Sequence, residues 1–353
     1  MRSSYSEEDV TILLKDITGM VEPQPAEARE KLIQSGYHYC EMLPLEYKPG
    51  EKYFALYKEA LRNYAGITAE ASAIVSEKIR KLYNSEITLV SLARAGTPVG
   101  IIIKRYLNKK YPDIKVNHYT ISIIRGKGID KNAMAYILQR HNPQTICFVD
   151  GWTGKGAILK TLRKELEEYD GVSDKLAVLA DPAHITDLYG TRSDFLIPSS
   201  CLNSTVSGLM SRTFLRSDII GENDFHGAAY YSELEQEDLS AEFIDTVIGA
   251  IDYNIDYSCV KEENDTGISG YDEVLKIQKE FNISDINFIK PGIGEATRVL
   301  LRRIPWKILV NDLNDTKYLA HIFRLAEEKN IEIVEYPMKC YRACGIIKDM
   351  ADI

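Results

Sequence analysis

The chain has 353 residues, of which 45% are hydrophobic and 27% charged, and its formal net charge is −9. This length and composition predict a globular protein with two domains and a substantial buried core. The acidic balance argues against a protein that coats nucleic acid along its whole length. Residues 281–353 differ, with 11 Lys/Arg against 10 Asp/Glu, so we expect any RNA contact in this C-terminal part.

The six cysteines are scattered and form neither a CxxC pair nor a series of metal-ligand spacings. The acidic, polar residues 1–9 do not resemble a secretory or transit segment, so we expect the cysteines to remain thiols in a reducing cytosol. No apolar run approaches the roughly 18 residues of a membrane span. These features predict a soluble, cytoplasmic protein without membrane contact.

Along the chain, helical patterns come first and then alternate with strands. Ser6 and the acidic residues after it predict a capped opening helix, and residues 51–83 carry a helical apolar period. Strands separated by helices pair in parallel, so the next part predicts an α/β fold with a parallel sheet. Its expected strands span 87–92, 115–124, 145–149, 176–180 and 195–197, and its expected helices span 98–107, 132–139 and 156–168.

The acidic, Asn-containing run 261–267 predicts a linker before a second, smaller α/β unit. We therefore expect two domains, 1–265 and 266–353. The second is expected to hold helices over 272–281, 294–303 and 317–329, strands over 286–289, 307–311 and 332–336, and a closing helix from Arg342.

Two loops that follow expected strands have the composition of phosphate-binding loops. The first reads Arg94-Ala95-Gly96-Thr97, and the second reads Asp150-Gly151-Trp152-Thr153-Gly154-Lys155-Gly156. Small residues at a helix start present N–H groups to anions, and ligands of parallel sheets bind beyond the carboxyl ends of the strands. Together the loops predict a ligand with phosphates at two places. A simple strand-to-helix turn is the alternative interpretation of each loop.

In these loops the first unit resembles the type I phosphoribosyltransferase fold. The resemblance implies that Arg94, Ala95, Gly96 and Thr97 bind pyrophosphate, and that Asp150, Gly151, Thr153, Gly154, Lys155 and Gly156 bind ribose 5-phosphate. Arg125-Gly126-Lys127-Gly128 matches the family's mobile catalytic loop. The implied ligands are phosphoribosyl diphosphate, an unidentified small-molecule or base acceptor, and Mg²⁺ held by Asp150. The implied catalytic residues are Arg94, Lys127 and Asp150. Gly151 stands where the family usually has a second acid.

More narrowly, residues 36–44 and 198–209 resemble segments of a bacterial family that occurs with tellurite-resistance and stress-response (Ter-type) operons. Its members are described as phosphoribosyltransferases with a Pelota-like RNA-binding tail, and elsewhere labelled cysteine protease StiP. Under the protease label, Cys201 would be the nucleophile, which needs a histidine within hydrogen-bonding reach. The alternative is that Cys201, Asn203 and Ser204 form a polar loop on the acceptor side of the pocket.

His38 lies among tyrosines in 36–44 and is either a lid residue or simply packed. His226 is expected to be a loop residue rather than a base. The local sequence around Cys201 shows neither a nucleophile elbow nor an oxyanion signature, which favours the polar-loop interpretation.

The second unit resembles the L7Ae/Pelota RNA-binding fold. The resemblance lies in Gly292–Arg298, Lys307–Asn311 and Tyr341–Gly345, with Gly294 where the family usually has Asn. A basic helical edge supports contacts to phosphate more than reading of sequence. The alternative is that this unit only covers the first domain or dimerises. The implied RNA-binding residues are Lys290, Gly292, Gly294, Glu295, Arg298, Arg302 and Arg303.

The sequence thus predicts a Mg²⁺-dependent phosphoribosyltransferase-like enzyme with an RNA-binding-type domain. It would form a nucleotide- or nucleoside-like product in a bacterial stress-response pathway. Two alternatives stay open: a cysteine hydrolase using Cys201, and a non-catalytic regulator that binds a phosphoribosyl ligand and RNA. A homodimer is a further expectation.

Overall fold

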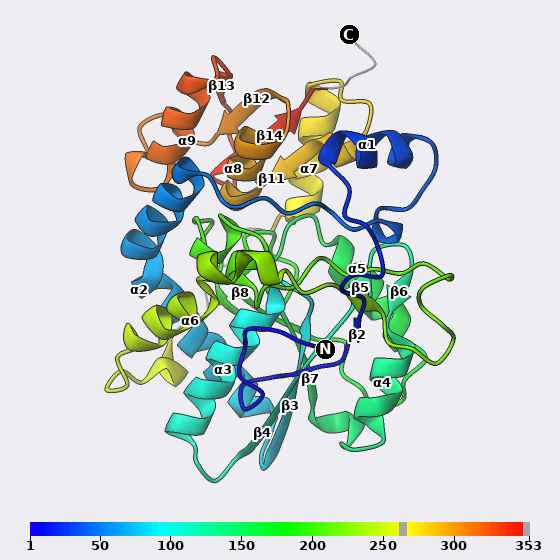
Figure 1. Ribbon diagram of the computed structural model, residues 1–353. Helices are drawn as coiled ribbons and strands as arrows, with labels where there is room; N and C mark the ends of the chain where they lie inside the picture. Colours follow the sequence, from blue (N-terminus) through cyan, green and yellow to red (C-terminus); the bar gives the residue numbers. More distant parts are fainter. Residues whose placement is uncertain (261–266, 349–353) are drawn as a thin grey trace.

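The computed structural model describes residues 1–260 and 267–348. Its first unit is built on a six-stranded sheet in the order β1-β4-β3-β7-β8-β9, with every neighbouring pair parallel (Figure 1). This confirms the predicted α/β class. The strands are β1 (Thr11–Ile12), β3 (Glu86–Leu92), β4 (Lys115–Ile121), β7 (Ile146–Trp152), β8 (Leu176–Ala180) and β9 (Tyr189–Thr191).

Helices cover both faces of this sheet. The apolar sides of α2 (Glu51–Leu82), α3 (Gly96–Lys110) and α6 (Ser240–Gly249) share one hydrophobic cluster with one face. Those of α4 (Lys131–Leu138) and α5 (Ala157–Leu166) pack on the other. Burial of both faces explains why β7 and β8 read as nearly continuous apolar runs.

The second unit has a four-stranded mixed sheet in the order β11-β14-β12-β13. Only β12 and β13 pair in parallel, since β14 is antiparallel to both of its neighbours. The smaller α/β unit is therefore confirmed. Its elements are α7 (Gly270–Glu280), β11 (Ile289–Pro291), α8 (Ile293–Arg302), β12 (Pro305–Val310), α9 (Thr316–Glu328), β13 (Glu332–Glu335) and β14 (Ala343–Ile347).

The two units share one continuous core. Buried side chains of α8 and α9, among them Leu300 and Ile322, belong to the same hydrophobic cluster as those of α2. Figure 1 shows the first turns of α2 beside α8 and α9 and its remainder along the first unit. The Tyr53 and Tyr64 hydroxyls on α2 donate to the Leu301 and Lys317 carbonyls at 2.9 and 3.0 Å. Apolar burial and directed hydrogen bonds therefore both fix the second unit on the first.

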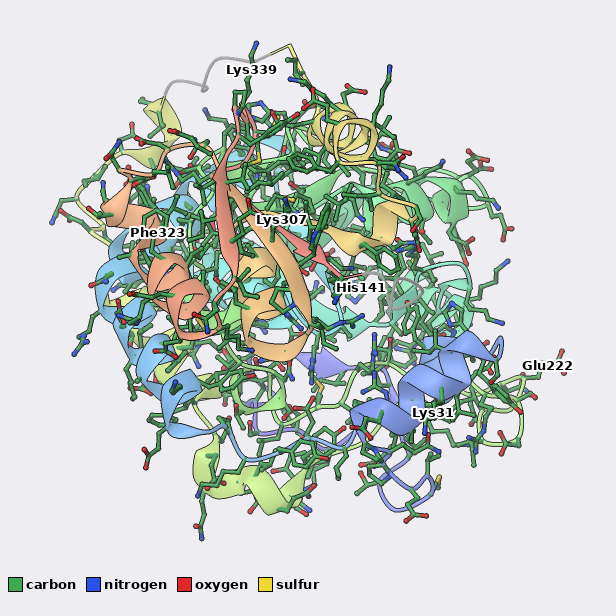
Figure 2. The ribbon with its side chains drawn as sticks, turned by 90° about the horizontal axis from the view of Figure 1, so that it is seen from above. Lys31, His141, Glu222, Lys307, Phe323 and Lys339 are labelled. Carbon is green, nitrogen blue, oxygen red and sulfur yellow. The ribbon has the colours of Figure 1, made fainter. Side chains whose placement is uncertain are left out.

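Short elements complete the fold. Helix α1 (Ala26–Gln34) lies to one side of the second unit, as Lys31 on α1 and Lys307 on β12 show in Figure 2. Strands β2 (Lys15–Asp16) and β10 (Gly227–Ala228) pair in parallel, and β5 (Ile123–Ile124) and β6 (Gly128–Ile129) form a small hairpin. No helix in the described ranges is both long and apolar enough to cross a membrane. The 3-10 helices are η1 (Tyr39–Glu41), η2 (Pro143–Thr145), η3 (Pro198–Ser200), η4 (Ser204–Val206), η5 (Ser232–Glu237), η6 (Tyr257–Cys259) and η7 (Ile286–Phe288).

Four predicted elements are wrong. In place of the strand expected over 286–289, Ile286–Phe288 is the 3-10 helix η7, and strand β11 begins only at Ile289. The opening helix is replaced by turns and by β1, because Thr11–Ile12 adds to the sheet edge beside β4. Residues 195–197 form no strand, and the last strand of the sheet is β9 instead. The closing helix from Arg342 is β14, whose five buried residues lie between β11 and β12. The predicted linker at 261–266 and the boundary at 265/266 lie outside the described residues.

Candidate functional site

The first predicted phosphate loop makes its contacts inside the protein. Arg94 follows β3, and its guanidinium donates to the Met210 carbonyl at 2.7 Å and lies 3.5 Å from the Glu46 carboxylate. Gly96 packs so tightly on β7 that a Cβ there would collide with the Val149 carbonyl. Thr97 is buried and accepts a hydrogen bond from Thr120 at 3.1 Å. The small residues of this loop thus serve the close approach of α3 to the sheet.

The second predicted phosphate loop ties the two units together. Lys155 donates to the Ile286 and Ile289 carbonyls of the second unit at 2.6 and 3.1 Å. Burial, with Lys290 and Arg125 nearby, lowers the pKa of Lys155 to about 8. The Gly154 carbonyl accepts a hydrogen bond from the Tyr341 hydroxyl at 3.0 Å. The Lys155 amine therefore already has partners within the chain, and Gly154 is held against the second unit.

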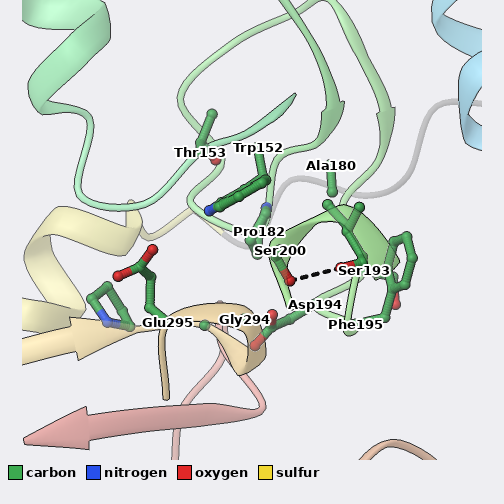
Figure 3. A pocket seen from close by; sticks show the side chains of 13 residues that line it. Trp152, Thr153, Ala180, Pro182, Ser193, Asp194, Phe195, Ser200, Gly294 and Glu295 are labelled. Atoms are coloured by element: carbon green, nitrogen blue, oxygen red, sulfur yellow. Dashed lines mark hydrogen bonds between the residues drawn. The ribbon is translucent and has the colours of Figure 1, made fainter. Parts of the chain in front are cut away.

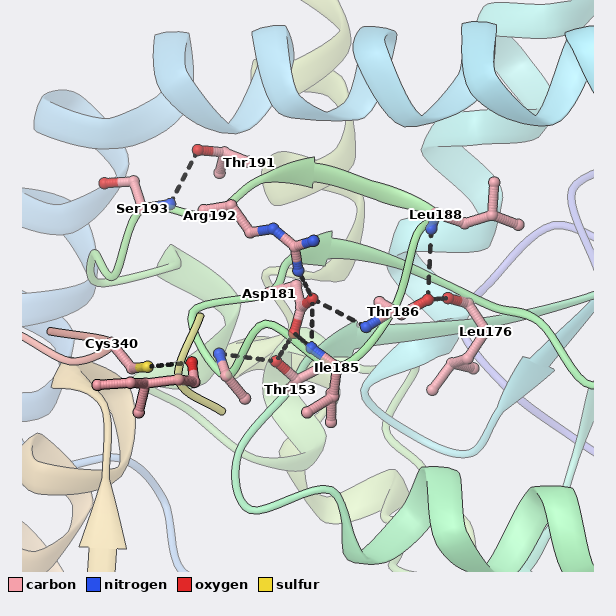
Figure 4. A network of polar contacts seen from close by, with 12 residues as sticks. Thr153, Leu176, Asp181, Ile185, Thr186, Leu188, Thr191, Arg192, Ser193 and Cys340 are labelled. Atoms are coloured by element: carbon pink, nitrogen blue, oxygen red, sulfur yellow. Dashed lines mark hydrogen bonds and ion pairs between the residues drawn. The ribbon is translucent and has the colours of Figure 1, made fainter. Parts of the chain in front are cut away.

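Thr153 of the same loop belongs to a buried network around Asp181 (Figure 4). Its hydroxyl donates to the Asp181 carboxylate, which also pairs with Arg192. The Asp181 carboxylate further accepts the Ile185 and Thr186 backbone N–H groups at 2.9 and 3.0 Å. The Thr153 hydroxyl is thus occupied by a structural carboxylate rather than open to a phosphate.

Asp150 lies at the carboxyl end of β7, where it accepts the Gly151 N–H at 2.8 Å. Burial raises the pKa of this carboxyl to about 7, although the Gly151 N–H lowers it. Within 1–260 and 267–348, no group of three His, Cys, Asp or Glu side chains is placed to hold a metal ion. Mg²⁺ at Asp150 stays an untested prediction, with one carboxylate to support it.

A small pocket between the units brings together residues predicted for two different sites (Figure 3). Thr153 of the second loop and Gly292, Gly294 and Glu295 of the predicted RNA-facing segment all line it. Asp194, buried in its wall, accepts the Ile293 N–H at 2.9 and 3.1 Å and the Arg342 N–H at 2.9 Å. The start of α8 is therefore turned toward the first unit.

Two of the predicted RNA-binding arginines also face the first unit. Arg302 donates to the Asn203 side chain at 2.5 Å and to the Cys201 carbonyl at 3.1 Å. Arg298 lies 3.4 Å from the same Asn203 oxygen. Arg303, in contrast, is exposed. Lys290 is half-buried, and burial is the main cause that lowers its pKa. The predicted basic edge is thus divided between the interior and the surface.

Cys201 lies in a setting that suits packing. Its side chain is 1% exposed within the main core, and neighbouring Ser204 is also buried. Burial raises the pKa of the Cys201 thiol to about 12 even though Arg302 and Arg298 oppose it. None of the hydrogen bonds of the described residues joins its sulfur to a histidine.

Cys40, by contrast, has a histidine partner. In η1 the Cys40 sulfur lies 2.9 Å from Nδ1 of His38, and it also lies 3.7 Å from the Leu215 carbonyl oxygen. Burial and Lys127 lower the pKa of His38, so the imidazole is neutral at pH 7. Burial and Glu41 raise the pKa of Cys40 to about 11. The resting pair is therefore a neutral thiol against a neutral base.

The predicted mobile loop lies against this pair. Arg125, Gly126 and Lys127 form the tip of the β5–β6 hairpin, and the Arg125 N–H donates to the Tyr39 hydroxyl at 3.0 Å. Lys127 lies 3.9 Å from the Glu41 carboxylate. A Cβ on Gly126 would be 3.8 Å from Nε2 of His38, so the tip stands directly beside the imidazole.

Four other histidines bond hydroxyl groups instead of a thiol. Their partners are Ser91 for His118, Tyr119 for His141, Ser122 for His226 and Thr297 for His321, at 2.7 to 2.9 Å. Under the protease label, Cys201 was the predicted nucleophile and Cys40 was not among the predicted site residues. The available signal was the His38-Tyr39-Cys40 spacing, which a single 3-10 turn can close into a contact.

Comparison with known proteins gives two family matches. Residues 3–248 match the family described as tellurite-like stress resistance cysteine protease StiP, and residues 268–349 match the PELOTA RNA binding domain. The chain is 35% identical to "Cysteine protease StiP" of Acinetobacter baylyi over 365 aligned residues, which cover 98% of this chain and 94% of that protein.

A solved structure is a weaker match. The crystal structure of HGPRT-ase from Leishmania tarentolae in complex with GMP covers 37% of this chain and 77% of that one, with 13% identity and a TM-score of 0.27. A likeness at this level carries no argument about function.

These findings correct the predicted activity. Both the family model and the relative describe a cysteine protease, so the prediction of a phosphoribosyltransferase that binds phosphoribosyl diphosphate is wrong. The contacts of Gly96, Thr153 and Lys155 give a physical reason for the error, because the loop composition serves packing and the joining of units. The stress-resistance family and the Pelota-type domain were predicted correctly.

Proposed function

The chain belongs to the StiP family, and from this we propose that it is a cysteine peptidase with Cys40 as nucleophile and His38 as general base. The observation that carries the proposal is the 2.9 Å contact between Nδ1 of His38 and the Cys40 sulfur. A thiol nucleophile needs a base at this distance. The relative's name supplies the reaction class, and the contact supplies the residues.

The proposed reaction has two steps. His38 Nδ1 takes the thiol proton while the Cys40 sulfur attacks the peptide carbonyl; the C–N bond then breaks, and His38 returns the proton to the leaving amine. Water, deprotonated by His38, attacks the resulting thioester, and the acid product leaves as the proton returns to sulfur. With the thiol as donor to Nδ1, the neutral ring carries its own proton on Nε2.

The pair must become accessible before it can act. Cys40 is 0% exposed, so the β5–β6 hairpin tip or residues 36–42 have to move before a peptide reaches the sulfur. Gly36 and Gly126 have positive φ values of 98° and 78° and lie in the two segments that would move. Opening removes the burial that raises the Cys40 pKa, and contact with water then favours the thiolate.

The test uses a peptidyl chloromethyl ketone as an active-site probe, read by intact mass, together with peptidase assays. Cys259 is exposed and would react on its own, so all variants are made on Cys259→Ser. The parent should gain one adduct, mapped to Cys40. Cys40→Ser should abolish adduct and activity, and His38→Ala should slow both by roughly 10²- to 10⁴-fold.

Cys201→Ser is the matched control, since it removes a buried thiol that has no histidine partner in the described structure. It should keep adduct formation and activity. Activity that survives Cys40→Ser, or that disappears in Cys201→Ser alone, would overturn the assignment of the nucleophile.

We also propose that the C-terminal unit contacts RNA, a proposal supported by the PELOTA match over residues 268–349. Arg303 is exposed, and Lys307 lies 4.5 Å from the ring centre of Trp306, which is 41% exposed. An exposed aromatic ring suits base stacking, and an exposed arginine suits phosphate contact. Fluorescence anisotropy with single-stranded RNA measures this affinity, which should fall as salt rises and in Trp306→Ala but should stay unchanged in Arg163→Ala. Equal RNA affinity of the wild type and both variants would refute the proposal.

A further inference from the structure

Four arginines from separate parts of the chain converge beside the proposed thiol site. Arg94 comes from the loop after β3 and Arg212 from the segment after η4, whereas Arg298 and Arg302 come from α8 of the second unit. We call them the arginine cluster. Because two members belong to each unit, the cluster exists only when the units are docked.

Asn203 and Glu46 connect three members of the cluster. The Asn203 side-chain oxygen accepts from Arg302 at 2.5 Å and lies 3.4 Å from Arg298, while its amide donates to Glu46 at 3.2 Å. The other Glu46 oxygen lies 3.5 Å from Arg94. The connecting side chains hold the guanidinium groups at fixed positions from both sides of the unit boundary.

The fourth member links the cluster to the thiol site. The guanidinium of Arg212 stacks 4.6 Å from the ring centre of Tyr39, the residue between His38 and Cys40. Burial, together with Arg29, Arg94 and Arg298, lowers the pKa of Arg212 to about 10. Arg212 therefore lies within electrostatic range of both the other arginines and the thiol pair.

The cluster carries more positive charge than the chain neutralises. Among the described residues, the carboxylate that pairs with its four guanidinium groups is that of Glu46, and this leaves an excess of three positive charges. The side chains of Arg94 and Glu46 are only 17% and 9% exposed, so water screens this excess poorly. Guanidinium groups that are fixed, half-buried and unneutralised bind planar anions well.

We propose that the arginine cluster binds side-chain carboxylates of an acidic peptide substrate, so that the peptidase prefers sequences rich in Glu and Asp around the bond it cleaves. This proposal rests on the proposed function for the identity of the ligand as a peptide. Glu46 already occupies part of the cluster in the way a substrate carboxylate would. A side-chain carboxylate is small enough for a half-buried site, whereas an RNA strand needs an open groove.

Binding is measured by fluorescence anisotropy with full-length Cys40→Ser, so that no cleavage interferes. The probes are a Glu-rich peptide, its Gln counterpart of equal length, and a single-stranded RNA. The Glu-rich peptide should bind roughly tenfold more tightly than the Gln peptide, and more weakly as salt rises. Arg212→Gln and Arg298→Gln should each reduce the affinity for the Glu-rich peptide roughly tenfold.

Arg163→Gln is the control, because this arginine on α5 pairs with Asp174 at the surface and lies outside the cluster. It should leave peptide affinity unchanged, and an unchanged melting temperature of each variant will show that the fold is retained. Equal binding of the Glu and Gln peptides would overturn the proposal, as would RNA binding that depends on Arg212 and Arg298 while peptide binding does not.

The two proposals can fail separately. If acidic peptides bind through Arg212 but the active protein never cleaves them, the peptidase proposal fails and the acidic site stands. If Glu and Gln peptides are cleaved with equal kcat/KM, the acidic preference fails and the peptidase stands.

Discussion

Replacing Asp194 with alanine should destabilise the docking of the second unit. Asp194 is 6% exposed, and its carboxylate accepts the backbone N–H groups of Ile293 at the start of α8 and of Arg342 just before β14. Alanine would leave both buried N–H groups without an acceptor. Each such group costs about 1–3 kcal/mol, so the free energy of unfolding should fall by about 2–6 kcal/mol.

The effect of Asp194→Ala should also depend on pH. Burial raises the pKa of Asp194 from its ordinary value of 3.8 to about 6, although the Ile293 and Arg342 N–H groups lower it. A raised carboxyl pKa means that its contribution to stability is full below pH 3.8 and is lost as pH rises through 6. Between pH 5 and pH 8 the wild type should lose stability, on the order of 1 kcal/mol, that Asp194→Ala, lacking the carboxyl, does not lose.

Urea unfolding at pH 5 and pH 8 measures both effects. Trp152 lies in the first unit and Trp306 in the second, so single-tryptophan variants report each unit separately by fluorescence. Asp174→Ala is the control, because its exposed pairing with Arg163 should contribute about 1 kcal/mol at most. A stability of Asp194→Ala within about 0.5 kcal/mol of wild type at pH 5 would refute this account of the contact.

Three further predictions concern the loop once expected to bind phosphate. Lys155→Met should lower the free energy of unfolding by about 1–3 kcal/mol, since two carbonyls of the second unit lose their donor. Hydrogen exchange of the backbone amides in β11 should become faster, and an unchanged exchange rate there would contradict the prediction. Thr153→Val should also cost about 1–3 kcal/mol in urea unfolding by removing a donor to buried Asp181, whereas Thr161→Val, which loses a half-buried bond within α5, should cost less. Because the pKa of Asp150 is raised to about 7, the wild type should lose stability as pH rises through 7. Asp150→Asn should abolish this loss, and at pH 8.5 its free energy of unfolding should be about 2 kcal/mol higher than that of the wild type. This value is roughly half of what the pKa shift alone would give, because the residue is only half-buried. If the stabilities of the two proteins change with pH in the same way, the prediction is refuted.

Much of the fold could be read from the sequence, because buried parallel strands and amphipathic helices leave strong periodic patterns. Residues 51–83 and 132–139 were predicted as helices, and α2 and α4 lie within a residue of those bounds. The closing segment failed because Ala343–Ile347 is a short apolar run without clear periodicity. This segment is a strand because it pairs with β11 and β12, which lie more than 30 residues earlier in the chain.

The site was harder to predict because composition does not reveal what a polar group faces. Lys155 and Thr153 have the residue types of a phosphate loop, but their partners lie 131 and 28 residues away in the chain. Arg298 and Arg302 were likewise predicted to form a solvent-facing basic edge, but in the structure both face Asn203 of the first unit. The His38–Cys40 contact, in contrast, joins residues two apart and was local enough to be found from spacing alone.

The core that runs without interruption from α2 into α8 and α9 has a consequence for how this protein can be taken apart. Family matches divide the chain neatly, at 3–248 and 268–349, and so invite expression of either piece alone. Each fragment would expose the apolar side chains that share one cluster in the whole chain, among them Leu300 and Ile322, and exposed apolar surfaces favour aggregation. The two units can therefore be recognised separately in the sequence, but neither is expected to fold well alone. Fusion or domain-exchange experiments should transfer both units together.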